Sequence, residues 1–382
     1  SQGQITVRAD NTGSEWAATI GEDNLGDTVF LSEKTTGTAI DISANAAIHA
    51  ALSINRNGTT VTNYFLANGG GAINLTGNGA TYVGLAMDRT QVLSSSGKIT
   101  LDGGPTWVGL GYMSRGEVYL GAKADSTFVP SSTADILVKA AGSIDSDNNT
   151  TMAVNTGGDL VVESTGNSFT GASNWGLTTT AKSFRFGKTG ETQDLTLIGA
   201  GTLAGPLTVY GGNVILTGGQ TLSAAGAKIL VKSVGYIRNG TAATFRTNNG
   251  SIVFWADSDG NSAGFISVYN GSTFNSANGG TTTTYTGGGD IVFGGGTTSD
   301  ASGYPTGSSF SDGSYTGFES GYGSTNQTSY YTGGGNFIVR GKSATGLDAV
   351  AFNGPNRVWA NGGQIDITAI ATGSGIGMQI QR

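Results

Sequence analysis

Cysteine is absent from this chain of 382 residues, and histidine occurs once, as His49. Without cysteine, neither disulfides nor thiolate metal sites can hold the fold together, so its stability must come from packing and backbone ladders. A single histidine makes a catalytic triad or a multi-histidine metal site hard to build. The composition therefore argues against the commonest enzyme and metalloprotein classes.

Charge and long apolar runs are also scarce. Only 12% of the residues are charged, the net charge is -7, and lysine and arginine form no cluster. A polyanion needs such clusters, so we expect no nucleic-acid partner. No stretch approaches the roughly 18 apolar residues that would span a bilayer, so we expect no membrane span. Ser1 opens directly into a strand pattern, which indicates a mature or excised piece of a longer protein.

Glycine, in contrast, is abundant, with 66 residues, while hydrophobic residues still supply 37% and can form a core. Many glycines stand before alternating apolar residues in the form Gly-x-Φ-x-Φ. A glycine can take positive φ at a sharp corner, and alternate residues of a strand face one way, so each segment predicts a turn and a short strand. These segments are 3–7, 71–75, 97–101, 158–162, 205–209, 212–216, 250–254, 289–293, 335–339 and 363–367.

Internal repeats give the spacing of these strands. Residues 134–139 match 227–232 at a shift of 93, and 285–292 match 331–338 at a shift of 46. Because 46 is about half of 93, we expect coils of roughly 20 to 25 residues with insertions, about 15 to 19 coils in all. The sequence thus predicts an all-β fold, a parallel β-helix (β-solenoid) with loop insertions and little or no helix. We expect a single domain over 1–382.

The segment from about 269 to 331 departs from this regularity, because Gly, Ser, Thr and aromatic residues dominate it. Flat rings stack against sugar faces, so one interpretation is a surface that recognises host or cell-surface glycans. The other is a set of enlarged corner loops whose rings cover the side of the solenoid. The candidate ligand contacts are Tyr304, Tyr315, Phe318, Tyr322 and Tyr330.

Two short runs offer closely spaced carboxylates. Asp257 and Asp259 lie in 257–261, and Asp145 and Asp147 lie in 145–149. Oxygen ligands of this kind suit Ca²⁺, although neither run carries the downstream glutamate of an EF-hand loop. The alternative is an Asx-type turn, in which the aspartate accepts a nearby backbone N–H. We expect no other cofactor and no catalytic residues.

The style of the repeats, above all over 205–216 and 227–268, resembles the β-strand-repeat regions of filamentous haemagglutinin-like exoproteins. These are very large bacterial surface or secreted adhesins, similar also to autotransporter passenger domains. The resemblance implies a right-handed β-helix that is exported to the cell exterior and has no enzymatic activity in its shaft.

Three functions fit these observations. The first is a structural or adhesive extracellular rod, a segment of a bacterial surface or secreted protein without catalysis. The second is a carbohydrate-active β-helix, such as a polysaccharide lyase, hydrolase or tailspike. The third is a subunit of an extracellular filament that assembles by end-to-end stacking on other copies, because a solenoid without caps has open ladders at its ends.

Overall fold

The fold consists of strands throughout the part that the structure describes. The computed structural model describes residues 3–13, 15–21, 26–48, 50–54, 61–110, 117–142, 144–146, 152–166, 169–172, 180–278, 286–322 and 326–381. They fall into two compact units, residues 1–186 (unit 1) and 187–382 (unit 2). Every regular element within those ranges is a strand, with no helix among them. The all-β prediction is confirmed.

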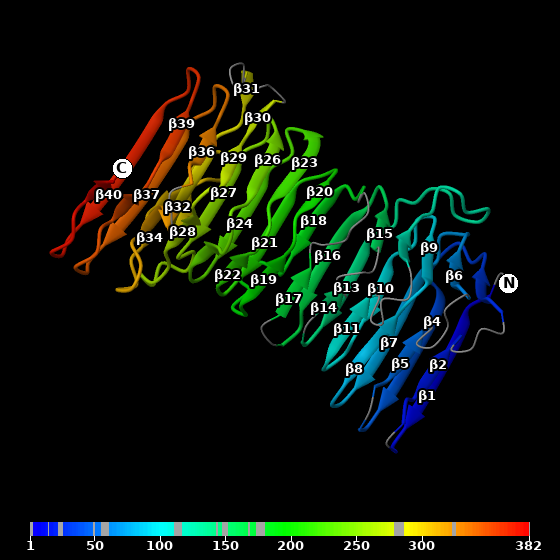
Figure 1. The fold of residues 1–382 in the computed structure, drawn as a ribbon. Coiled ribbons are helices and arrows are strands. Elements are labelled where there is room, and N and C mark those ends of the chain that lie inside the picture. The colour runs from blue at the N-terminus through cyan, green and yellow to red at the C-terminus, as the bar shows by residue number, and fades with distance from the viewer. Residues whose placement is uncertain are drawn as a thin grey trace. The chain divides into compact units, whose positions relative to one another are not determined.

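Unit 1 stacks its strands into three parallel sheets, which the chain visits in turn, coil after coil (Figure 1). The first sheet holds β1 (Ile5–Asn11), β4 (Thr38–Ala46), β7 (Ala72–Gly79), β10 (Ile99–Asp102), β13 (Ile136–Ala140), β16 (Asp159–Ser164) and β18 (Ser183–Phe186). The second holds β2 (Ala18–Ile20), β5 (Leu52–Ile54), β8 (Val83–Met87), β11 (Trp107–Leu110), β14 (Ile144–Ser146) and β17 (Phe169–Ala172). The third holds β3 (Thr28–Ser32), β6 (Asn63–Ala67), β9 (Thr90–Ser94), β12 (Val118–Gly121) and β15 (Met152–Asn155).

Unit 2 repeats this three-sheet plan. The first sheet holds β21 (Leu207–Gly211), β24 (Ile229–Ser233), β27 (Ile252–Ala256), β32 (Ile291–Ser299), β37 (Phe337–Ser343) and β40 (Ile365–Ala371), with β33 (Pro305–Gly307) and β34 (Ser309–Phe310) beside it. The second holds β19 (Leu195–Ile198), β22 (Val214–Leu216), β25 (Ile237–Asn239), β28 (Ile266–Tyr269), β35 (Phe318–Tyr322), β38 (Val350–Phe352) and β41 (Met378–Ile380). The third holds β20 (Gly201–Leu203), β23 (Gln220–Ala225), β26 (Thr244–Asn248), β29 (Thr273–Asn275), β36 (Thr328–Tyr331) and β39 (Asn356–Trp359).

Pairing within both units is that of a parallel β-helix. Among the described strands only two pairs run antiparallel, β32 with β33 and the hairpin of β30 (Ala277–Asn278) with β31 (Thr286–Gly288). Both lie in the segment that was expected to bear loops. The predicted β-solenoid architecture is confirmed, and the prediction of a single domain over 1–382 stays a prediction.

All ten Gly-x-Φ-x-Φ segments contain strands, and nine of them belong to the first sheet. In β10, Ile99 and Leu101 are fully buried while Thr100 between them is half-buried. Successive side chains of a strand point to opposite faces, so the apolar pair faces the core. The motif therefore marks one column of the solenoid rather than strands in general.

The role expected for the motif glycines is wrong. None of them has positive φ; in four coils the residue immediately before has it instead, at Gly70, Asn249, Gly334 and Gly362. A Cβ built on Gly335 would overlap the carbonyl oxygen of Gly289 in the coil before, and one on Gly363 would overlap that of Gly335. Close approach of successive backbones, and not a left-handed corner, requires glycine here.

The expected coil length holds only in part. Ile136 pairs with Leu160 and Ile229 with Ile252, spacings of 24 and 23 residues. Ile291, however, pairs directly with Phe337, so the 46-residue shift is one coil and not two. The residues between β32 and β35, which include β33 and β34, lengthen this coil. Insertions of this kind leave fewer coils than the 15 to 19 expected.

The two cores differ in chemistry. Inward positions of unit 1 are mostly aliphatic, as at Ile40, Ile73 and Val138, all fully buried. Unit 2 instead packs rings between its sheets, and Phe293 lies within 5.8 Å, centroid to centroid, of Phe254, Phe274, Phe318 and Tyr330. Large rings therefore occupy inward positions in unit 2 that aliphatic side chains occupy in unit 1.

Candidate functional site

The loop that follows β27 carries the first pair of predicted calcium ligands. Asp257 is 3% exposed, and its Oδ1 accepts the backbone N–H groups of Ser262 at 3.0 Å and Ala263 at 3.4 Å. Burial raises the pKa of Asp257, because desolvation disfavours the carboxylate. Asp259 accepts the side-chain amide of Asn261 at 2.8 Å. Asp259 also accepts the backbone N–H of Asn261, two residues on, as in the Asx-type turn of the alternative interpretation, whereas Asp257 bonds backbone N–H groups five and six residues on.

The second predicted run is only partly described. Asp145 belongs to β14, but its side chain and the whole of Asp147 lie outside the described residues. Within the described ranges, no three His, Asp or Glu side chains come together in a way that could hold a metal ion. Calcium binding by these runs stays a prediction.

Substitution at Asp257 separates the two interpretations. Asp257→Ala is expected to cost about 1–3 kcal/mol of stability, because it leaves the N–H groups of Ser262 and Ala263 unpaired. Asp257→Asn retains an acceptor oxygen and should lose less. Thermal unfolding with and without EDTA should give the same melting temperature for wild type. A melting temperature that falls with EDTA in wild type, but not in Asp257→Ala, would instead establish a calcium site.

Three of the predicted ligand-contact rings are buried. Phe318 and Tyr330 are fully buried, and Tyr304 is 8% exposed. The hydroxyl of Tyr330 lies 2.5 Å from Ser320 Oγ, and that of Tyr304 lies 2.6 Å from Ser251 Oγ. A sugar cannot reach Phe318 or Tyr330 unless the coil opens, so we assign these rings to packing. The paired hydroxyls explain why tyrosine is accommodated inside.

Tyr315 is the partly exposed member of this set, and the side chain of Tyr322 lies outside the described residues. Tyr315 stacks on Phe265 with centroids 4.4 Å apart, and Phe265 stacks on Tyr236 at 4.9 Å. The guanidinium carbon of Arg238 lies 5.7 Å from the Tyr315 centroid. Phe265 and Arg238 hold the ring of Tyr315 against the solenoid. Because the ring is also partly exposed, Tyr315 remains a candidate ligand contact.

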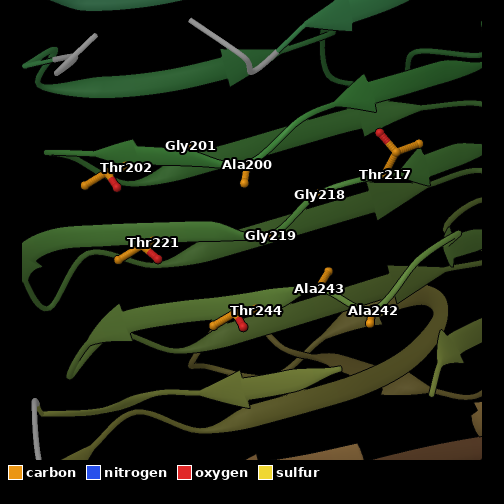
Figure 2. A pocket seen from close by; sticks show the side chains of 10 residues that line it. All are labelled: Ala200, Gly201, Thr202, Thr217, Gly218, Gly219, Thr221, Ala242, Ala243 and Thr244. Atoms are coloured by element: carbon orange, nitrogen blue, oxygen red, sulfur yellow. The ribbon is translucent and has the colours of Figure 1, made fainter. Parts of the chain in front are cut away.

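A shallow groove of about 460 Å³ crosses the third sheet of unit 2. Figure 2 shows Thr202, Thr221 and Thr244 one below another on successive strands, with alanine and glycine between them and Thr217. Thr202 and Thr221 are register partners in β20 and β23. No titratable side chain lines this threonine groove, so it offers hydroxyl hydrogen bonds but no acid or base.

A second groove, of about 470 Å³, crosses the third sheet of unit 1 and is chemically richer. Its lining combines two phenol rings, an amide and charges of both signs. We call it the tyrosine groove, defined by Thr62, Tyr64, Arg89, Gln91, Glu117, Tyr119 and Lys123. Three of these residues lie at outward positions of β6, β9 and β12, and the other four lie just before or just after these strands.

Sequence reasoning missed the tyrosine groove because its members meet only through register. Tyr64 pairs with Gln91 and Gln91 with Tyr119, at spacings of 27 and 28 residues. The neighbouring coils of the first sheet differ more, since Ile73 to Ile99 spans 26 residues and Ile99 to Ile136 spans 37. The usable signal was the alternation in 63–67 and 118–120, where Tyr64 and Tyr119 stand at outward positions.

Comparison with known proteins returns no match, whether to protein-family models, to curated proteins or to solved structures. None of the described segments is a helix long and apolar enough to cross a membrane. The function must therefore be argued from the two units themselves.

Proposed function

We propose that this protein is a structural or adhesive extracellular rod, a segment of a bacterial surface or secreted β-solenoid protein that performs no catalysis. The observation that carries the proposal is the in-register stacking of parallel coils in both units. The style of the repeats, similar to filamentous haemagglutinin-like exoproteins, supports the extracellular setting.

Stacked coils suit a rod for a physical reason. Each coil contacts only its neighbours, so every added coil lengthens the stack by about 4.8 Å without changing the core. Cross-coil ion pairs on the outer face add to the ladder: Lys139 lies 2.8 Å from Asp102, and Arg8 lies 2.5 Å from Asp41. Such a body sets distance and stiffness, while its side grooves and loops are free to make contacts.

Small-angle X-ray scattering with a sugar-release assay tests this proposal. We expect the profile of an elongated, rigid monomer and no release of reducing ends from polysaccharides. A compact profile, or the profile of two units on a flexible joint, would contradict the rod. Polysaccharide cleavage would instead support the carbohydrate-active alternative.

A filament subunit is the second candidate, favoured by the exposed apolar residues of the last coil. Ile365, Ile376 and Ile380 are 54%, 54% and 70% exposed. Strand β40 pairs with β37 along one edge, and its other edge has no partner in the described chain. An uncovered ladder with apolar side chains is a template for another strand.

The first coil of a second copy fits this edge. Residues 363–367 and 3–7 share the pattern Gly-Gln-Ile-x-Φ. Within one copy, Ile5 pairs with Ile40 of the next coil. In the contact between two copies, Ile365 would pair with Ile5 of the second copy in the same way. Sedimentation velocity should show concentration-dependent oligomers for wild type and fewer for Ile365→Lys. The control is Phe128→Lys, at an exposed apolar residue between β12 and β13 and thus away from both end coils. Monomers at all concentrations would exclude the filament.

A further inference from the structure

The tyrosine groove has the arrangement of a carbohydrate site. Tyr64, Gln91 and Tyr119 form a row across β6, β9 and β12, perpendicular to the strands. Neighbouring strands lie about 4.8 Å apart, so the two tyrosine positions are separated by about 9.6 Å, two coils. That spacing is comparable to the length of one disaccharide in an extended glycan.

Both rings are held in place by packing. Tyr64 and Tyr119 are half-buried against a cluster that includes Leu66, Leu93 and Val129. A ring fixed in this way loses little conformational entropy when a ligand stacks on it. Aromatic side chains with one apolar and one wet side are suited to binding amphipathic sugar faces.

Polar groups frame the rings. The hydroxyl of Tyr119 donates to a Glu117 carboxylate oxygen, and the Lys123 ammonium lies 2.6 Å from Asp125 and 5.2 Å from the Tyr119 centroid. Burial, followed by the hydrogen bond to Glu117, raises the pKa of Tyr119 to about 12, so this hydroxyl stays a donor at neutral pH. The lysine contact is weak enough for a ligand to displace, since exposed cation–π pairs are worth about 0.5–1 kcal/mol.

Arg89 lines the groove and has an unusual backbone conformation. Its φ of 41° lies in the left-handed region, which non-glycine residues rarely occupy. Its Nε is buried and has no hydrogen-bond partner among the described residues. Strained backbone and an unpaired buried donor are features that cluster at ligand sites.

We propose that the tyrosine groove binds a neutral, extended glycan that runs along the stacking axis. Sugar rings stack on Tyr64 and Tyr119, and their hydroxyls bond Gln91, Glu117 and Arg89. The glycan is neutral because Arg89 and Lys123 are balanced by Glu117 and Asp125, which leaves no net attraction for a polyanion. This inference rests on the adhesive part of the proposed function and names its ligand class.

Titration calorimetry of the full chain tests the groove. The probes are hexasaccharides of β-1,4-linked glucose, N-acetylglucosamine, xylose and mannose, with polygalacturonate as the acidic comparison. We expect at least one neutral hexasaccharide to bind, and Tyr64→Ala to weaken that binding tenfold or more. Arg89→Gln should weaken it as well. The matched control, Tyr82→Ala, removes a 46% exposed tyrosine outside the groove and should bind as wild type does.

Folding and binding are separated by a second variant and a second measurement. Gln91→Ala removes an amide without touching the packed rings, so it should keep the wild-type melting temperature and still weaken binding. The proposal is overturned if no neutral hexasaccharide binds at millimolar concentration, if polygalacturonate alone binds, or if Tyr64→Ala and Tyr82→Ala have equal affinities. Small-angle scattering from the same samples tests the shape of the protein independently of glycan binding. If the protein is an elongated rod that binds no glycan, the glycan inference is wrong and the rod proposal still holds.

Discussion

Replacing Phe293 with alanine is expected to lower the free energy of unfolding by about 3–5 kcal/mol, the usual cost of truncating a buried ring. Phe293 is fully buried, and its ring lies 4.9 Å from Phe318, 5.2 Å from Phe274 and 5.6 Å from Phe254, centroid to centroid. The variant therefore leaves a cavity at the centre of the ring cluster in unit 2. Chemical denaturation followed by intrinsic fluorescence measures the loss.

Phe128→Ala is the matched control, because Phe128 is 42% exposed. Its removal should change the free energy of unfolding by no more than about 0.5 kcal/mol, as for other surface substitutions. Equal effects at the two positions would show that the rings do not form the core of unit 2.

Gly250→Ala should also lower the stability of the chain. A Cβ at this position would overlap the carbonyl oxygen of Ala227, which belongs to the backbone of the preceding coil and cannot rotate away. Forcing extra volume into a packed site costs about 1–3 kcal/mol. For a unit of this size that corresponds to a melting temperature lower by several degrees, about 2–4 °C per kcal/mol. Differential scanning calorimetry gives the shift.

Gly240→Ala serves as its control. A Cβ on Gly240 would meet no atom within 4 Å, and its φ is not positive. The substitution restricts the unfolded chain, so stability should stay the same or rise by about 0.4–1 kcal/mol. If Gly250→Ala is tolerated as well as Gly240→Ala, the coils are not stacked as closely as described.

Much of the fold was predictable because the alternation of apolar and polar residues in the Gly-x-Φ-x-Φ segments depends only on neighbouring residues of one strand. Ile99 and Leu101 alternate with polar neighbours, and a period of two needs no knowledge of the rest of the chain. The glycine was correctly located but wrongly explained, since Gly335 is small to admit the backbone of Gly289 and not to adopt positive φ. Local pattern cannot distinguish those two causes.

The sites were less predictable because they depend on register. Phe318 follows a glycine and Tyr330 is one of two adjacent tyrosines, so their inward orientation shows only once β35 and β36 are stacked on β28 and β29. Tyr64, Gln91 and Tyr119 likewise meet only when coils of unequal length are aligned. Insertions such as the one between β32 and β35 alter that alignment, and the composition of 269–331 indicates extra loops there without giving the register of the coils.

The register itself can be measured directly, because the chain has no cysteine of its own. Thr100 and Leu137 are partners in adjacent coils, and their Cα atoms should lie about 4.8 Å apart, within the range that a disulfide bridges. Oxidation of the double variant Thr100→Cys, Leu137→Cys should give an intramolecular disulfide, detected by mass spectrometry. The pair Thr100→Cys, Val138→Cys should not, because Val138 faces the core. Cross-linking of the second pair and not the first would contradict the stacked parallel coils on which the rod depends.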